Sequence, residues 1–147
     1  MRALLQRVSR ASVRVGDDTI AAIGPGLVVL VGVGHGDDDT TAANLARRIT
    51  ELRIFRDEDG RTNRSILDVV GAALVVSQFT LYADTSRGRR PGFTNAAEPA
   101  VADRLYLAVA AGLRAAGVGD VQTGAFGAEM AVELVNDGPF TIWLDTA

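Results

Sequence analysis

The feature that most constrains the fold of this chain is an unbroken apolar run at residues 27–33. Aliphatic and β-branched residues without alternation are typical of a strand that is buried on both faces. A second apolar run covers residues 72–82, and it becomes partly polar from Ser77 onward. If this second strand is regular, its side chains alternate, with Ser77, Phe79 and Leu81 on one face and Gln78, Thr80 and Tyr82 on the other.

Two stretches show helical periodicity. Apolar residues recur with helical spacing from Ala42 to Leu52, and the acidic residues 37–39 before them suit a helix N-terminus. We interpret this acidic run as helix capping and solubility in preference to a metal site. A second helix is predicted to start at Glu98 and to end at residues 117–119. Its expected buried stripe is Val101, Leu105, Ala108, Val109, Gly112 and Leu113.

The remaining extended segments complete the predicted order of elements. Residues 6–15 and 19–23 flank a turn at residues 16–18, residues 53–56 are a short extended piece, and residues 121–123 form a short strand. The order β-β-β-α-β-α-β-β-β fits an α+β fold. We expect one domain over residues 1–147, with a curved, barrel-like mixed or antiparallel sheet covered by two main helices.

The last predicted pair of strands, residues 130–135 and 140–144, flanks the turn formers Asn136, Asp137, Gly138 and Pro139. This pattern predicts a β-hairpin. Pro139 has no N–H, so the returning strand would begin without one ladder donor. A Gly–Pro bond can be cis, although physical reasoning alone favours an ordinary turn.

Composition narrows the possible chemistry. The chain has no Cys, one His (His35), and no Lys among its 15 basic residues, which excludes thiolate nucleophiles, multi-histidine metal sites and Schiff bases. No apolar run is long enough to span a bilayer, and the first residues do not resemble a signal peptide, so we expect a cytosolic protein. A net charge of −3 argues against a protein that coats long nucleic acid, while a small patch that binds a nucleic acid end remains possible.

No side-chain triad can be assembled from these residues. A Ser–His–Asp triad would need His35, which lies between two glycines and is interpreted as a loop residue. Ser77 lacks the motif of a nucleophile elbow, and Thr80 lacks a base. A site that orients its substrate through main-chain amides and hydroxyls remains, with the reactive group supplied by the substrate or by water. Spacing alone leaves open whether residues 77–82 line such a pocket or make cross-strand hydrogen bonds.

A long loop at residues 83–97 contains three arginines and an aromatic residue. Arg87, Arg89, Arg90 and Phe93 could hold a phosphate and stack on a base. The alternative is a solvated charged loop.

Several segments together resemble one family, the D-aminoacyl-tRNA deacylases. The matching residues are 6–8, 11–13, 30–33, 52–55, Ser77 to Tyr82, Gly88 to Pro91 with Phe93, and Asn136 to Thr141. Each segment alone is weak evidence for the family, but the strand that begins at Ser77 together with the late Asn-Asp-Gly-Pro turn is specific for it. The match runs in order along nearly the whole chain.

The resemblance implies hydrolysis of the ester between an amino acid and the terminal adenosine of tRNA. It implies a homodimer in which Gly138 and Pro139, joined by a cis bond, enter the partner's pocket and exclude L side chains. Ser77, Gln78, Phe79 and Thr80 would hold the amino group and the ester carbonyl, and the substrate's 2′-hydroxyl would assist without an obligatory protein base. The other substrate contacts would be Phe126, Met130 and Asn136, with Arg87, Arg89, Arg90 and Phe93 on the tRNA acceptor end.

Glycine mischarged on alanine tRNA would be a further substrate, and no cofactor, metal, membrane or DNA is implied. Two residues depart from the family pattern: Phe140 stands where Val is expected, and Gly92 where Ser is expected. The change at Phe140 leaves the preference for substrate side chains open. The alternatives are a non-catalytic module that binds an RNA or tRNA end, and a β-rich dimer whose terminal hairpin only mediates assembly.

Overall fold

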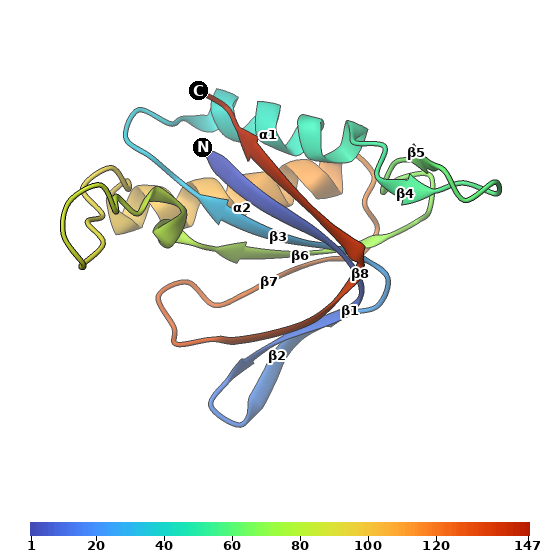
Figure 1. Ribbon diagram of the computed structural model, residues 1–147, viewed down its shortest axis with the longest axis horizontal. Coiled ribbons are helices and arrows are strands. Elements are labelled where there is room, and N and C mark those ends of the chain that lie inside the picture. Colours follow the sequence, from blue (N-terminus) through green and yellow to red (C-terminus); the bar gives the residue numbers. More distant parts are fainter.

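The computed structural model describes residues 1–147, which form a six-stranded sheet with two helices packed on it and a small separate two-stranded sheet (Figure 1). The strand order is β2-β1-β3-β6-β7, and β8 pairs with β1. The elements are β1 (Arg2–Val15), β2 (Asp18–Ile23), β3 (Gly26–Gly32), α1 (Asp39–Glu51), β4 (Phe55–Arg56), β5 (Thr62–Arg64), β6 (Ala72–Ser77), the 3₁₀ turn η1 (Phe79–Tyr82), α2 (Pro99–Ala115), β7 (Val121–Thr123) and β8 (Ala131–Asp145).

The sheet is mixed and strongly curved. Strand β1 pairs antiparallel with β2, β3 and β8, whereas the β3–β6 and β6–β7 pairs are parallel. The curl brings β2 against β6 and β7, where the amide of Ala22 donates to Oε1 of Gln122 at 2.8 Å. The predicted α+β class, with a barrel-like sheet and two main helices, is confirmed.

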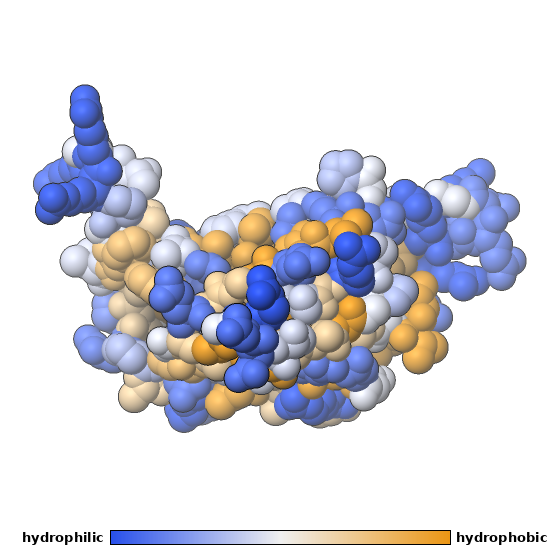
Figure 2. Space-filling view, turned by 90° about the horizontal axis from the view of Figure 1, so that it is seen from below, coloured by the Kyte–Doolittle hydropathy of each residue, from blue (hydrophilic) through white to orange (hydrophobic).

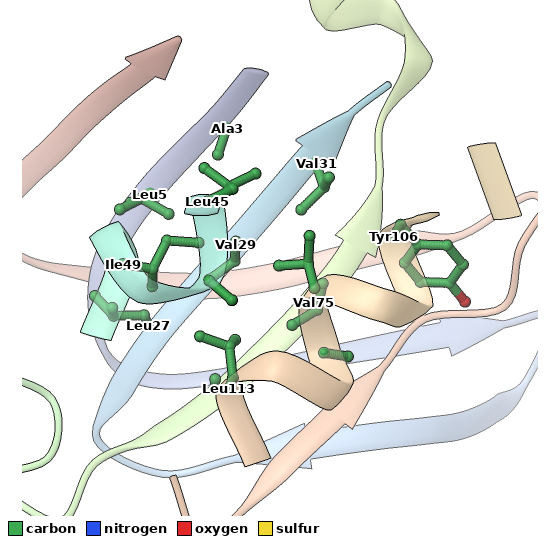
Figure 3. Packing of buried hydrophobic residues seen from close by; sticks show 14 of the residues in the cluster. Ala3, Leu5, Leu27, Val29, Val31, Leu45, Ile49, Val75, Tyr106 and Leu113 are labelled. Carbon is green, nitrogen blue, oxygen red and sulfur yellow. The ribbon is translucent and has the colours of Figure 1, made fainter. Parts of the chain in front are cut away.

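Two hydrophobic clusters fill the two sides of this curved sheet. The larger cluster lies between the sheet and the helices, where Leu45 and Ile49 of α1 and Leu113 of α2 pack over Val29 and Val75 (Figure 3). The smaller cluster lies inside the curl and draws its side chains from β1, β2, β3 and β6. Strand β3 contributes to both clusters, which explains its continuous apolar sequence.

The first helix follows its prediction closely. Ala42, Leu45, Ala46 and Ile49 are buried along one face of α1. The side chain of Asp38 accepts a hydrogen bond from the Thr41 amide at 2.8 Å, and this bond lowers the pKa of the Asp38 carboxyl. The predicted capping role of the acidic run is therefore confirmed at Asp38.

The second helix differs from its predicted stripe. Leu105, Val109 and Leu113 are buried as expected, but Val101 is exposed. The buried face also contains Ala102, Tyr106 and Ala110. The buried face of α2 is therefore shifted by one residue from the predicted one, which corresponds to a rotation of about 100° around the helix axis. Neither α1 nor α2 combines the length and apolar character needed to cross a membrane.

We predict that two neighbouring glycines respond very differently to the same substitution. Gly26 pairs with Ala72 across the β3–β6 ladder, and a Cβ on it would lie 1.9 Å from the Ala72 carbonyl oxygen. Gly24 has nothing within 4 Å of the corresponding position. Gly26→Ala should therefore lower the free energy of unfolding by about 3 kcal/mol or more, measured by urea denaturation. Gly24→Ala is the control and should leave stability within about 1 kcal/mol of the original. An equal loss of stability in Gly26→Ala and Gly24→Ala would contradict the close approach of Gly26 to Ala72.

Candidate active site

A cavity of about 610 Å³ opens where strand β6 ends. Its walls come from β6, η1, the loop before α2, the start of α2, and the segment that leads into β8. Ten of its fourteen lining residues are hydrophobic. The lining residues are Val76, Ser77, Gln78, Phe79, Phe93, Ala96, Ala97, Pro99, Ala102, Phe126, Gly127, Ala128, Met130 and Val132.

The predicted strand over residues 72–82 is wrong in its second half. Strand β6 ends at Ser77, which pairs with Val31, and its partner β3 ends one residue later at Gly32. Without a partner strand the chain turns into η1, and Leu81 and Tyr82 pack back over Gly32. The alternation of faces expected beyond Ser77 is therefore absent.

Six of the residues singled out in the sequence line this cavity: Ser77, Gln78, Phe79, Phe93, Phe126 and Met130. The rings of Phe79 and Phe93 meet edge to face, with centroids 4.9 Å apart. Phe126 stacks on Tyr106 at 5.9 Å. Burial, the largest cause, raises the pKa of Tyr106. Thr80 does not line the cavity, but its hydroxyl oxygen accepts a hydrogen bond from the Gln78 side-chain amide.

The arginine-rich loop lies outside the cavity. Arg87, Arg89 and Arg90 are exposed, and the loop is closed at its base by paired hydrogen bonds between Asp84 and Gly92. Figure 2 shows a hydrophilic projection at the end of the molecule where Figure 1 places this loop. Phe93, just after the arginines, is the residue of this segment that reaches the cavity.

The single histidine supports the loop that forms one wall. Nε2 of His35 lies 2.8 Å from the carbonyl oxygen of Thr94, and the Ala97 amide donates to the Val33 carbonyl oxygen at 2.9 Å. His35 does not line the cavity. The interpretation of His35 as a loop residue is confirmed.

The cavity has no ionisable side chain among its lining residues. Its polar side chains are Ser77 and Gln78, so the lining can donate and accept hydrogen bonds but offers no carboxylate, imidazole or ammonium group. No group of three or more His, Cys, Asp or Glu side chains is arranged to hold a metal ion in this structure. The arrangement is suited to orienting a group through hydrogen bonds beside apolar walls.

The predicted terminal hairpin is wrong. Residues 131–145 form one strand, β8, which runs antiparallel to β1 along its whole length. Gln6 pairs with Thr141 and Val8 with Asn136, so β8 has four residues, 137–140, where β1 has only Arg7. The turn is therefore a large bulge opposite Arg7.

Side-chain hydrogen bonds hold the bulge in shape. Oδ1 of Asn136 accepts from the Phe140 amide at 3.0 Å, and its Nδ2 donates to the Thr141 hydroxyl at 3.0 Å. The Gly138–Pro139 peptide is cis, as the resemblance implied. Gly138 and Pro139 are exposed and do not line the cavity of their own chain.

Arg7 is the residue that sequence reasoning missed. It is 4% exposed and follows Ala3 and Leu5 on the inward face of β1. Its Nε donates to the Asp137 carbonyl oxygen at 3.1 Å, and its Nη1 donates to the Ile54 carbonyl oxygen at 2.5 Å. An arginine at an inward position of an alternating strand is the signal that could have identified it.

Two further contacts complete the surroundings of Arg7. The Asp137 carboxylate lies 3.4 Å from Nε, and the guanidinium lies 4.7 Å from the centre of the Phe140 ring. A buried cation is costly unless it is paired and hydrogen-bonded. The bulge supplies a carboxylate, a carbonyl oxygen and an aromatic face, so the bulge and Arg7 stabilise each other.

We predict that Asn136 stabilises the bulge through the Phe140 amide. Asn136→Ala removes the acceptor for this partly buried N–H and should cost about 1–2 kcal/mol of unfolding free energy. Thr141→Val is the control, because it removes the hydroxyl that accepts exposed hydrogen bonds from the Asn136 and Gln6 side chains and leaves the bond to the Phe140 amide in place. Urea denaturation of both variants measures the difference. A loss in Thr141→Val as large as that in Asn136→Ala would contradict this assignment.

Comparison with known proteins gives one consistent result. A sequence model of the family "D-Tyr-tRNA(Tyr) deacylase" matches residues 4–145. A "D-aminoacyl-tRNA deacylase" from Dinoroseobacter shibae is 63% identical over 145 residues, which are 99% of each chain. A protein of the same name from Roseiflexus sp. is 60% identical over 147 residues, which are 100% of this chain and 94% of the relative.

Two solved structures share the fold of this chain. A structure titled "c-Myc DNA Unwinding Element Binding Protein" superposes with a TM-score of 0.94 at 39% identity, covering 100% of this chain and 99% of the other. A "probable eukaryotic D-amino acid tRNA deacylase", 18% identical, shares the fold with a TM-score of 0.81, covering 97% of each chain. The chain described here belongs to the D-Tyr-tRNA(Tyr) deacylase family.

Proposed function

We propose that this protein hydrolyses the ester that joins a D-amino acid to the terminal adenosine of tRNA, and so releases the free D-amino acid and the tRNA. The observation that carries this proposal is the 63% identity to a D-aminoacyl-tRNA deacylase over 99% of both chains. The family match over residues 4–145 supports the same assignment. A glycine carried by alanine tRNA, which has no side chain to exclude, is a second substrate of the same cavity.

The cavity lining supports a mechanism that depends on orientation. Ser77 and Gln78 supply hydrogen bonds, with Thr80 bound to Gln78, and Phe79 supplies an apolar wall. A water molecule adds to the ester carbonyl carbon, and the 3′-oxygen of the adenosine leaves with a proton. The neighbouring 2′-hydroxyl of the substrate assists proton transfer, which fits a lining without ionisable groups.

Two observations support a homodimer in which the bulge of one chain enters the cavity of the other. Gly138 and Pro139 are exposed, and they do not line the cavity of their own chain. Strand β8 pairs only with β1, so its other edge is unpaired over a long strand. An unpaired edge of this length favours association with another strand. In the dimer, the carbonyl oxygens of Gly138 and Pro139 face the α-carbon of the substrate and exclude L side chains.

The arginine-rich loop is proposed to bind the tRNA acceptor end. Arg87, Arg89 and Arg90 are exposed beside Phe93, which reaches the cavity. Phosphates approaching the cavity would therefore meet a cationic loop, and the ring of Phe93 offers a face for stacking. The substrate contacts proposed for Phe126 and Met130 follow from their places in the lining, and Asn136 acts through the bulge that it stabilises.

Phe140 stands where the family pattern has Val, and its aromatic ring provides a face for the guanidinium of Arg7. The ring is half-buried and packs against the main core, so it lies behind the bulge. Gly92 lies at the base of the arginine-rich loop, where it pairs with Asp84.

The cytoplasmic location expected from the sequence stays a prediction, as does the single domain over residues 1–147.

We predict strong chiral discrimination. Purified protein incubated with D-tyrosyl-tRNA should release D-tyrosine at least about a hundredfold faster than it releases L-tyrosine from the L-tyrosyl counterpart, because the bulge excludes the L side chain. Acid-precipitable labelled aminoacyl-tRNA measures both rates. Equal rates would contradict the exclusion. Binding without any release of the D form would favour the non-catalytic module that holds a tRNA end.

Subunit complementation tests whether the bulge acts on the partner's cavity. One variant carries Gln78→Ala in the cavity, and the other carries Gly138→Ala, whose Cβ would lie 3.0 Å from Nη2 of Arg7. After each is shown to be inactive alone, they are mixed and allowed to exchange subunits. About a quarter of the original activity should return, because each mixed dimer has one intact cavity that faces one intact bulge. If the bulge served its own chain's cavity, mixing would restore nothing.

A further inference from the structure

The guanidinium of Arg2 connects the edge of the sheet to the turn that follows β6. Its Nε donates to the Asp145 carboxylate at 3.2 Å, and its Nη1 donates to the Leu81 carbonyl oxygen at 2.9 Å. Its central carbon lies 4.4 Å from the centre of the Tyr82 ring and 5.8 Å from that of Trp143. The Leu81 and Tyr82 contacts are both to η1.

The η1 turn has few contacts of its own to fix its position. It comprises four residues, none of which is buried, and no side chain caps its start. A 3₁₀ turn of this length has poor hydrogen-bond geometry and depends on its surroundings. Phe79, its first residue, is 52% exposed and forms part of the cavity wall. The near end of the turn is held by the Gln78 amide, which donates to the Val31 carbonyl oxygen at 2.7 Å, so the position of this wall also depends on what holds the far end.

Tyr82 anchors that far end against β3. A Cβ on Gly34 would lie 2.6 Å from the Tyr82 ring, so the ring packs directly against the backbone of this glycine. The Tyr82 hydroxyl donates to Oδ2 of Asp37 at 3.5 Å, and Asp37 also accepts from the Gly34 amide at 2.7 Å. Burial, with the Asp37 charge as a smaller cause, raises the pKa of Tyr82 to about 12, so the hydroxyl is protonated at neutral pH. The Arg2 guanidinium lies over the Tyr82 ring as a cation.

We propose that Arg2 is a positioning residue for the cavity: by binding the Leu81 carbonyl oxygen and the Tyr82 ring, it fixes η1 and thereby places Phe79 and Gln78 for the substrate. The proposal rests on the function proposed above. Arg2 touches no lining residue of the cavity in the contacts described, so its effect is transmitted through η1. A guanidinium can donate to a carbonyl oxygen and stack on a ring at once, which few other side chains can do.

The competing explanation is that Arg2 only ties β1 to β8. The Arg2–Asp145 ion pair is partly exposed on both sides, at 35% and 33%, and such a pair contributes little to stability. Asp145→Asn removes this pair and leaves the contacts of Arg2 with Leu81 and Tyr82. It is therefore the matched control. If Arg2 acted through this ion pair with β8, the two substitutions would have the same effect.

The test compares Arg2→Met, Arg2→Lys and Asp145→Asn in the full chain. Arg2→Met should lower kcat for D-aminoacyl-tRNA by about tenfold or more with a smaller change in KM, because a small misplacement of orienting groups slows the chemical step. Arg2→Lys keeps a cationic donor and should recover part of this loss. Asp145→Asn should retain the original kcat. Unchanged kcat in Arg2→Met, or an equal loss in Asp145→Asn, would overturn the proposal.

Amide hydrogen exchange of the η1 segment provides a readout that does not depend on turnover. Arg2→Met should speed exchange at residues 78–83 relative to both the original protein and Asp145→Asn, while α1 and α2 are unaffected. Unchanged exchange at residues 78–83 would overturn the bracing role, whatever the kinetics. If the original protein released no D-amino acid, the proposed function would fail, and exchange would still decide whether Arg2 holds η1.

Discussion

The structure depends on the pairing of its first strand with its last. Strand β1 pairs with β8 from Arg2 and Asp145 at one end to Arg14 and Ala131 at the other. Along its opposite edge, the same strand pairs first with β3 and then with β2. Both hydrophobic clusters contain side chains of β1. The larger cluster also contains Leu144 of β8, so it cannot be completed before the two ends of the chain have met, and the fold requires contacts of very long sequence separation.

The pairing is interrupted at one point, and a single side chain compensates for the interruption. Where β8 bulges outward, the ladder loses its regular hydrogen bonds. Arg7 points into this gap and donates to main-chain oxygens of both Asp137 and Ile54, which lie in distant parts of the chain. A hydrophobic residue there would fill space but leave these oxygens without a charged donor. The bulge therefore projects from the sheet as an ordered loop.

The sequence predicted those elements whose signal is local. The helices and the buried strand β3 were recognised because their periods and runs reflect which faces are buried. The terminal hairpin was wrong because two β-prone runs around a turn look alike whether they pair with each other or with a third strand. The partner of β8 lies about 130 residues away, and no local pattern identifies it. Likewise, nothing near Ser77 signals that β3 ends too soon to support a longer β6.

The same distinction applies to the candidate site. Residue types alone led to a site that orients its substrate without a base, and the resemblance to a family named the residues. Six of these residues gather in one cavity because of the positions of β6, the loop before α2 and the segment before β8. The supporting arginines were not recognised, because an arginine in a strand is usually solvent-exposed and its partners here are main-chain oxygens far along the chain.

Strand β1 supports both parts of the proposed discrimination. Arg7 holds the bulge from the inward face of β1, and Arg2 holds η1 from the end of the same strand. A filter that distinguishes D from L side chains works only if its surfaces are fixed to a fraction of an ångström, because the two substrates differ only in where one group points. Loops alone hold positions less well than regular strands do. Attaching both supports to one long, doubly paired strand gives each chain a rigid element at both places where a substrate would be inspected.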